Sequence, residues 1–131
     1  MFGKKTKSLP PVQPRRVASQ LEEDIKLVGD LSFSGLLQLK GNVYGNIISP
    51  PDSEATLLIE EGATVTGEIR VPYIQIKGKV TGNVFASHRI SIKTGSTVIG
   101  DVHYNDIELD QGAHLSGHLI SMKEAKEELK S

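Results

Sequence analysis

A pair of glycines recurs five times between Leu39 and Leu119, and no other feature limits the fold as strongly. In each copy a turn centred on the first glycine lies between two aliphatic residues, and a third aliphatic follows the second glycine. Ten of the thirteen glycines belong to these pairs. With a half copy at Gly29, the second glycines are separated by 16, 22, 15, 18 and 17 residues. The copies read LKGNVYGNI, IEEGATVTGEI, IKGKVTGNV, IKTGSTVIGDV and LDQGAHLSGHL.

This spacing predicts a three-sided β-helix. It is too short for helix-pair repeats or propeller blades, which need more than about 30 residues per unit. Glycine allows the backbone to bend sharply at a corner, so two glycines per turn mark two corners. The spacers alternate apolar and polar residues on both sides of a third corner, as in Ile69, Val71, Ile74 and Ile76. We therefore expect an all-β parallel solenoid of about six turns with a narrow aliphatic core.

The chain divides into three segments. Residues 1–21 contain three prolines and five basic side chains without an acidic one, which predicts a disordered basic arm. Residues 22–121 form the predicted β-helix, and the one long interval is explained by a solvated loop at residues 49–54. Residues 122–131 form a polar tail in which Met122, Ala125 and Leu129 have helical spacing. So short a helix is marginal alone, which leaves an unattached tail and a cap as alternatives.

The repeat carries a recurrent step of aliphatic, any residue, glycine, then Asn, Asp or Glu, then aliphatic. It occurs from Val43 to Ile47, Val65 to Ile69, Val80 to Val84 and Val98 to Val102. In this step, and in its basic arm and polar tail, the chain resembles the bactofilin family of bacterial cytoskeletal proteins. The resemblance implies a right-handed helix, nucleotide-independent non-polar filaments, and peptidoglycan-modifying enzymes or other morphogenetic proteins as partners. The last repeat departs from the pattern, because His118 replaces the Asn or Asp.

The first residues suit a peripheral membrane anchor, as in some bactofilins. An apolar pair, Met1 and Phe2, precedes Lys4, Lys5 and Lys7, which can meet anionic headgroups. The sequence has no apolar run of transmembrane length and no signal-peptide pattern. We therefore expect a cytoplasmic protein that is peripheral at the inner membrane and binds its anionic lipids.

The two ends of a β-helix expose unpaired backbone groups and the ends of its apolar core. Solenoids that remain monomeric need polar caps, and the sequence shows no convincing one. We therefore expect self-assembly by end-to-end contact. The predicted interface residues are Ile25, Leu27, Leu31 and Phe33 at one end and Ile107, Leu109, Leu115 and Leu119 at the other.

The alternative class is a left-handed hexapeptide β-helix, as in trimeric acyltransferases or related carbonic anhydrases. Aliphatic or small residues do recur every six positions from Ile74 to Val98, but the small residue expected after each is absent. His88, His103, His114 and His118 are interpreted as outward-facing residues rather than zinc ligands or bases. No catalytic, metal or cofactor site is predicted. Nucleic-acid binding is not expected, because the domain is acidic and poor in aromatics.

Overall fold

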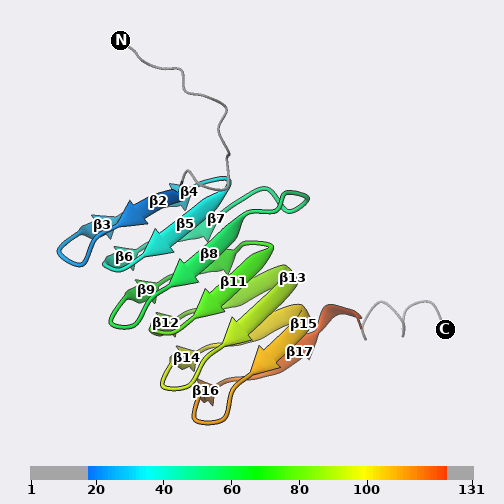
Figure 1. The fold of residues 1–131 in the computed structure, drawn as a ribbon. Helices are drawn as coiled ribbons and strands as arrows, with labels where there is room; N and C mark the ends of the chain where they lie inside the picture. The colour runs from blue at the N-terminus through cyan, green and yellow to red at the C-terminus, as the bar shows by residue number, and fades with distance from the viewer. Residues whose placement is uncertain (1–17, 124–131) are drawn as a thin grey trace.

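The computed structural model describes residues 18–123 and shows a right-handed, three-sided parallel β-helix of six turns (Figure 1). Each turn adds one short strand to each face. Strands β13 and β15 run through a corner and therefore belong to two faces. The predicted fold class is confirmed. In Figure 1 the strand numbers begin at β2, the first strand of the described residues.

The three faces follow one another along the chain. The first contains β2 (Ala18–Leu21), β5 (Leu36–Leu39), β8 (Thr56–Ile59), β11 (Tyr73–Ile76) and the later halves of β13 (Val84–Ile92) and β15 (Val102–Leu109). The second contains β3 (Lys26–Val28), β6 (Asn42–Tyr44), β9 (Thr64–Thr66), β12 (Lys79–Thr81), β14 (Thr97–Ile99) and β16 (His114–Ser116). The third contains β4 (Leu31–Ser32), β7 (Ile47–Ile48), β10 (Ile69–Arg70), the early halves of β13 and β15, and β17 (Leu119–Ser121).

Inward-facing side chains stack into columns along the solenoid axis. On the second face the parallel register places Val43, Val65, Val80 and Val98 directly above one another. All four are buried, and in residues 18–123 the buried apolar core consists of Val, Ile, Leu and Ala alone. The predicted aliphatic column is therefore present, because β-branched residues pack well on pleated strands and alternate between the two sides.

The second glycines of the repeat also form a column. Gly67 has φ +152°, and a Cβ added there would lie 2.1 Å from the carbonyl oxygen of Gly45 in the preceding turn. The same clash, at 2.0–2.2 Å, occurs at every later second glycine and at Gly45 itself. A side chain would therefore force adjacent turns apart. This close approach, rather than the bend alone, explains why the second glycine recurs.

The predicted start of the domain is wrong. Residues 18–21, which we expected in the arm, form β2 and pair in parallel with Leu36–Leu39. The reason is that β5 offers an unpaired edge to the preceding chain, and Leu21 packs against the core. The rest of the expected arm, residues 1–17, lies outside the described residues. So does the tail beyond Lys123.

Two other features of the sequence are explained by the fold. The long interval corresponds to a strand-free connection between β7 and β8, where Pro50, Pro51 and Asp52 are exposed as predicted. The six-residue spacing reflects successive faces, because Ile74, Val80 and Ala86 face the core from the first, second and third faces in turn. Among the residues described here, no helix has the length and apolar character needed to cross a bilayer.

Candidate assembly interface

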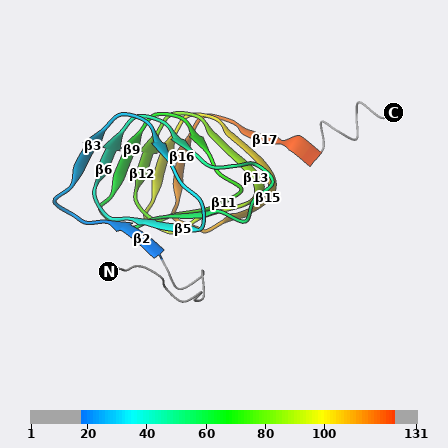
Figure 2. The same cartoon turned by 90° about the horizontal axis from the view of Figure 1, so that it is seen from above.

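The N-terminal end of the solenoid exposes the first members of the core columns. Leu27 and Leu31 end the columns that continue through Val43 and Ile47. Both are only partly buried, as is Phe33. These three predicted interface residues therefore lie together at the end. Figure 2 views the molecule towards this end, with β2 and β3 in the outermost turn.

The C-terminal end exposes the last members of the same columns. Leu109, Leu115 and Leu119 pair in register with buried residues of the fifth turn, and Ile107 lies beside them on the first face. Leu109 is 48% exposed and Leu119 is 38% exposed, whereas their fifth-turn neighbours are 0% exposed. The structure thus brings the four predicted residues of this end together.

Both ends also have open strand edges. β2, β3 and β4 pair only with the second turn, while β16 and β17 pair only with the fifth-turn strand segments, among the strands that residues 18–123 form. In the same part of the chain no further element lies across either end. Each end therefore presents apolar side chains together with backbone donors and acceptors that a second molecule can satisfy.

A ladder of polar side chains links the turns at the second-glycine corner. The Asn46 backbone N–H donates to Asp30 Oδ1 at 3.0 Å, and the Glu68 N–H donates to Asn46 Oδ1 at 2.9 Å. Further along, the Asp101 N–H donates in the same way to Asn83 Oδ1 at 3.1 Å. Where Asn or Asp occupies this position, its side-chain oxygen accepts a backbone N–H of the next turn, which explains why these residues recur, whereas Glu68 pairs with Arg70 instead.

The ladder ends in a His–Asp pair at the C-terminal end. His118 Nδ1 lies 3.1 Å from Asp101 Oδ1, which also accepts the His118 backbone N–H. The side-chain hydrogen bond from His118, and after it the backbone one, lowers the pKa of Asp101. His118 therefore replaces Asn or Asp in the last turn of the described chain, where no following strand is present to donate a backbone N–H to a side-chain oxygen at this position.

A second charged cluster lies on the outer surface of the first face, near the C-terminal end. Glu108 accepts a hydrogen bond from Ser91 Oγ at 3.1 Å, and its Oε1 lies 3.4 Å from Lys93 Nζ and 3.5 Å from Arg89 Nη2. These contacts, the Ser91 hydrogen bond first, lower the pKa of Glu108. The cluster is exposed, so its interactions are screened by solvent and add little stability.

The four histidines do not converge. His88 stacks on Tyr73, His103 stacks on Phe85 with ring centroids 4.2 Å apart, His114 is exposed, and His118 pairs as described. Within residues 18–123 no three His, Cys, Asp or Glu residues are grouped so that they could hold a metal ion.

One predicted interface residue of the N-terminal end, Ile25, lies outside the core columns, and Leu21, which was not predicted, lies within them. Ile25 is 39% exposed but lies in the turn between β2 and β3, outside the core columns. Leu21 caps the column of Leu39 and packs against the core, yet it was assigned to the arm. The sequence marks Leu21 only as an aliphatic residue directly before the acidic residues Glu22, Glu23 and Asp24. The predicted membrane residues Met1, Phe2, Lys4, Lys5 and Lys7 lie outside the described residues.

Within residues 18–123, the fold is a parallel β-helix that exposes apolar columns and strand edges at both ends, an arrangement typical of solenoids that associate through their ends. A sequence profile of the Bactofilin family, described as polymer-forming cytoskeletal, matches residues 19–120. The chain is also 32% identical over 101 residues to bactofilin BacO of Myxococcus xanthus (strain DK1622), covering 76% of this chain and 77% of the relative. The chain belongs to the bactofilin family.

Two solved structures share the fold. Bactofilin of Thermus thermophilus, seen in double helical filaments, superimposes with a TM-score of 0.67 at 21% identity, covering 79% of this chain and 98% of that one. The cytoskeletal bactofilin BacA gives a TM-score of 0.65 at 22% identity, covering 81% and 97%. The family's description makes this chain one of the polymer-forming cytoskeletal proteins.

Proposed function

We propose that this protein is a non-enzymatic cytoskeletal scaffold that assembles end to end, with like ends in contact, into filaments that need no nucleotide. The observation that carries the proposal is that, in residues 18–123, nothing covers either end, where the core columns stop at leucines that are partly exposed at the N-terminal end and up to 48% exposed at the C-terminal end. Each junction that hides a few hundred Å² of apolar surface gains several kcal/mol, at about 25 cal/mol per Å². Association costs reduce this gain, so assembly depends on concentration.

The two ends of one core column provide a test of this geometry. Leu27 and Leu115 are its first and last members, on the second face. If like ends meet, Leu27→Arg leaves only the C-terminal junction and Leu115→Arg leaves only the N-terminal one. Each variant then stops at dimers, and the double variant is monomeric. Analytical ultracentrifugation measures the masses, and circular dichroism checks that β-structure is retained.

Thr66→Arg is the matched control, since it adds the same side chain at an exposed, outward position in the third turn. This control should still form filaments under negative-stain microscopy in buffer without nucleotide. Monomers from both single end variants would instead indicate head-to-tail contacts and contradict the like-ended arrangement. A uniform closed oligomer of the unmodified protein, such as a trimer, would contradict end-to-end assembly into filaments.

We also propose that the filament lies at the cytoplasmic face of the inner membrane, held by Met1, Phe2, Lys4, Lys5 and Lys7. Support comes from the apolar pair beside three lysines and from the multiplication of weak anchors along a polymer. Phe2→Glu should abolish co-sedimentation with anionic liposomes at low salt. Val12→Glu, which also replaces an apolar residue of the arm by glutamate, should not. Equal loss in both variants would show that arm charge, not the apolar tip, governs binding.

The same scaffold is proposed to organise cell-shape factors, including peptidoglycan-modifying enzymes. The support is the family resemblance together with a repetitive surface that can display many identical binding sites. Affinity capture from cells that express the unmodified chain or the double end variant tests this idea. Recovery of wall-modifying enzymes with filaments, but not with monomers, is expected. Recovery of none with either form would contradict the proposed role.

A further inference from the structure

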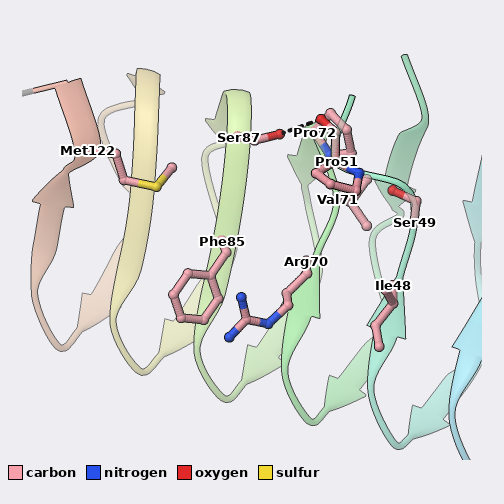
Figure 3. Close-up of a pocket in the computed structure, with 9 residues that line it drawn as sticks. All are labelled: Ile48, Ser49, Pro51, Arg70, Val71, Pro72, Phe85, Ser87 and Met122. Carbon is pink, nitrogen blue, oxygen red and sulfur yellow. Dashed lines mark hydrogen bonds between the residues drawn. The ribbon is translucent and has the colours of Figure 1, made fainter. Parts of the chain in front are cut away.

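An apolar groove of about 290 Å³ follows the corner between the third and first faces, on the outside of the solenoid (Figure 3). It lies on the flank of the solenoid. The lining comes from the second, third and fourth turns and from Met122, which follows the last strand, and among its nine lining residues Arg70 is the only charged one. The apolar part of the lining consists of Ile48, Pro51, Val71, Pro72, Phe85 and Met122.

The last described residues lie at one end of this groove. Met122 follows β17 and turns its side chain across β15, on the side of Phe85 (Figure 3). The backbone of Met122 and Lys123 is helical and does not begin a seventh turn of strand. Lys123 Nζ lies 3.5 Å from Asp106 Oδ1, on the flank of the solenoid. The chain therefore leaves the domain beside the groove.

The chain that follows has the length and pattern to cover the part of the groove between Met122 and Phe85. Continued as a helix, it would place Ala125 and Leu129 on the same side as Met122. At 1.5 Å per residue, Leu129 would lie about 10 Å beyond Met122. That is about two solenoid turns at roughly 4.8 Å each, which is the separation between Met122 and Phe85. Arg70 already pairs with Glu68 and lies over the Phe85 ring, so the apolar pattern of the segment, and not its charge, favours it as the occupant.

We propose that residues 124–131 dock back into this groove of their own chain as an amphipathic helix that continues from Met122, with Ala125 and Leu129 against the apolar lining. The tail then lies along the flank of the solenoid and leaves the C-terminal end bare. It also occupies an apolar surface that a partner would have to open. This inference does not depend on the proposed function, since it concerns one molecule.

Thiol accessibility tests the docking, because the chain has no cysteine of its own. Ser87→Cys places a thiol in the groove lining, and Leu115→Arg in the same chain limits assembly. The rate of alkylation by a maleimide then reports whether the groove is covered. Leu129→Ser should raise this rate roughly tenfold, since full burial of a leucine changes an equilibrium by about that factor. Glu127→Ser, on the opposite side of the helix, is the matched control and should leave the rate unchanged.

Equal rates in the parent, the Leu129→Ser chain and a chain ending at Lys123 would overturn the proposal. Faster alkylation only after removal of residues 1–17 would identify the proline-rich arm as the occupant instead. Loss of protection on changing from filaments to the end variant would show that the tail occupies a neighbour's groove, which contradicts docking in the same chain.

A cross-link provides a second, positive readout. Ser87→Cys combined with Ala125→Cys should form a disulfide under mild oxidation in the end-variant background. Ser87→Cys combined with Glu124→Cys, one residue away but on the opposite side of the helix, should do so much more slowly. Similar rates for the two pairs would mean that the segment has no fixed face toward the groove, contrary to the proposal.

Discussion

The middle and the end turns of this solenoid are built from the same repeat, yet their core residues have different surroundings. Ile76, in the fourth turn, is fully buried between two neighbouring turns. Leu109, at the same position of the sixth turn, is 48% exposed. The residue type and its place in the repeat are equivalent. The number of neighbouring turns alone decides whether such a side chain stabilises the monomer or is left for contact with a second molecule.

This difference separates stability from assembly along one axis. In the middle, each inward side chain and each second glycine of the repeat is packed against neighbouring turns, so substitutions there should damage the fold. At each end, the neighbouring turn on one side is missing. The same substitutions there should therefore lower the stability of the monomer less and weaken assembly of the polymer more. Equivalent positions compared across turns therefore measure the two roles separately.

The largest expected effect is at the glycine column. Gly67→Ala should destabilise the domain by roughly 3–5 kcal/mol, because the new Cβ adds a backbone clash to an unfavourable positive φ. Gly29→Ala, at the open first turn with φ +129° and nothing within 4 Å, should cost only about 1–2 kcal/mol. Urea unfolding of both in an assembly-blocked background measures the two values. Equal costs would mean that the contact between turns does not matter.

A smaller effect is expected in the core column. Ile76→Ala should cost about 3 kcal/mol through lost burial and an unfilled cavity. Leu109→Ala should cost the monomer about 1 kcal/mol, since half of its surface is already exposed. The difference should narrow when unfolding is measured on filaments, where Leu109 is proposed to be covered. An unchanged Leu109→Ala cost in filaments would argue against burial of this end.

The smallest effect concerns the His–Asp pair at the C-terminal end. The folded-state pKa of Asp101 is lowered, so its contribution is present above the unfolded pKa, near 3.8, and is lost as the pH falls through the lower folded value. Asp101→Asn should therefore flatten the acid side of the plot of melting temperature against pH.

Asn83 provides the control for this pH response. Its side chain is neutral and accepts the Asp101 backbone N–H at the equivalent corner of the preceding turn. Asn83→Ala therefore removes one bond of the ladder without removing a titrating group, and it should lower the melting temperature by a similar amount at every pH. If the melting temperature of Asp101→Asn falls at acid pH as much as that of the unmodified protein, the His–Asp pair does not contribute to the pH dependence of stability.

Much of the fold could be predicted because the repeat carries its own geometry. The glycine pairs located two corners, and the alternating spacers located the inward residues of the first and third faces. Leu27, Leu115 and Leu119 were placed at the column ends for this reason, whereas Ile25 precedes the first glycine step and lies in a turn. The periodic part of the sequence was sufficient, since every turn repeats the same packing problem.

Sequence reasoning could not reach what depends on contacts outside the repeat. Nothing in residues 18–21 shows the period, so β2 becomes visible only once the open edge of β5 is known. In the groove, Ile48, Arg70 and Phe85 occupy equivalent positions of successive turns, but the residue type changes from turn to turn and gives no apolar pattern in the sequence. Met122 lies beyond the last strand of the repeat. The role of the second glycine could be seen only in the structure. A sharp bend of the backbone and a close approach between turns both require glycine, so the sequence does not distinguish them.

The parallel register has a further consequence for how the molecule opens. Because each turn contacts only the turns before and after it, thermal opening can begin at either extremity and spread inward without disturbing the opposite half. Backbone amides should then exchange with solvent fastest in β3 and β16 and slowest in β9 and β12. When two molecules join, the backbone amides of the joined ends should also exchange slowly. A long polymer should then behave as one continuous solenoid whose amides exchange fastest only at its two tips.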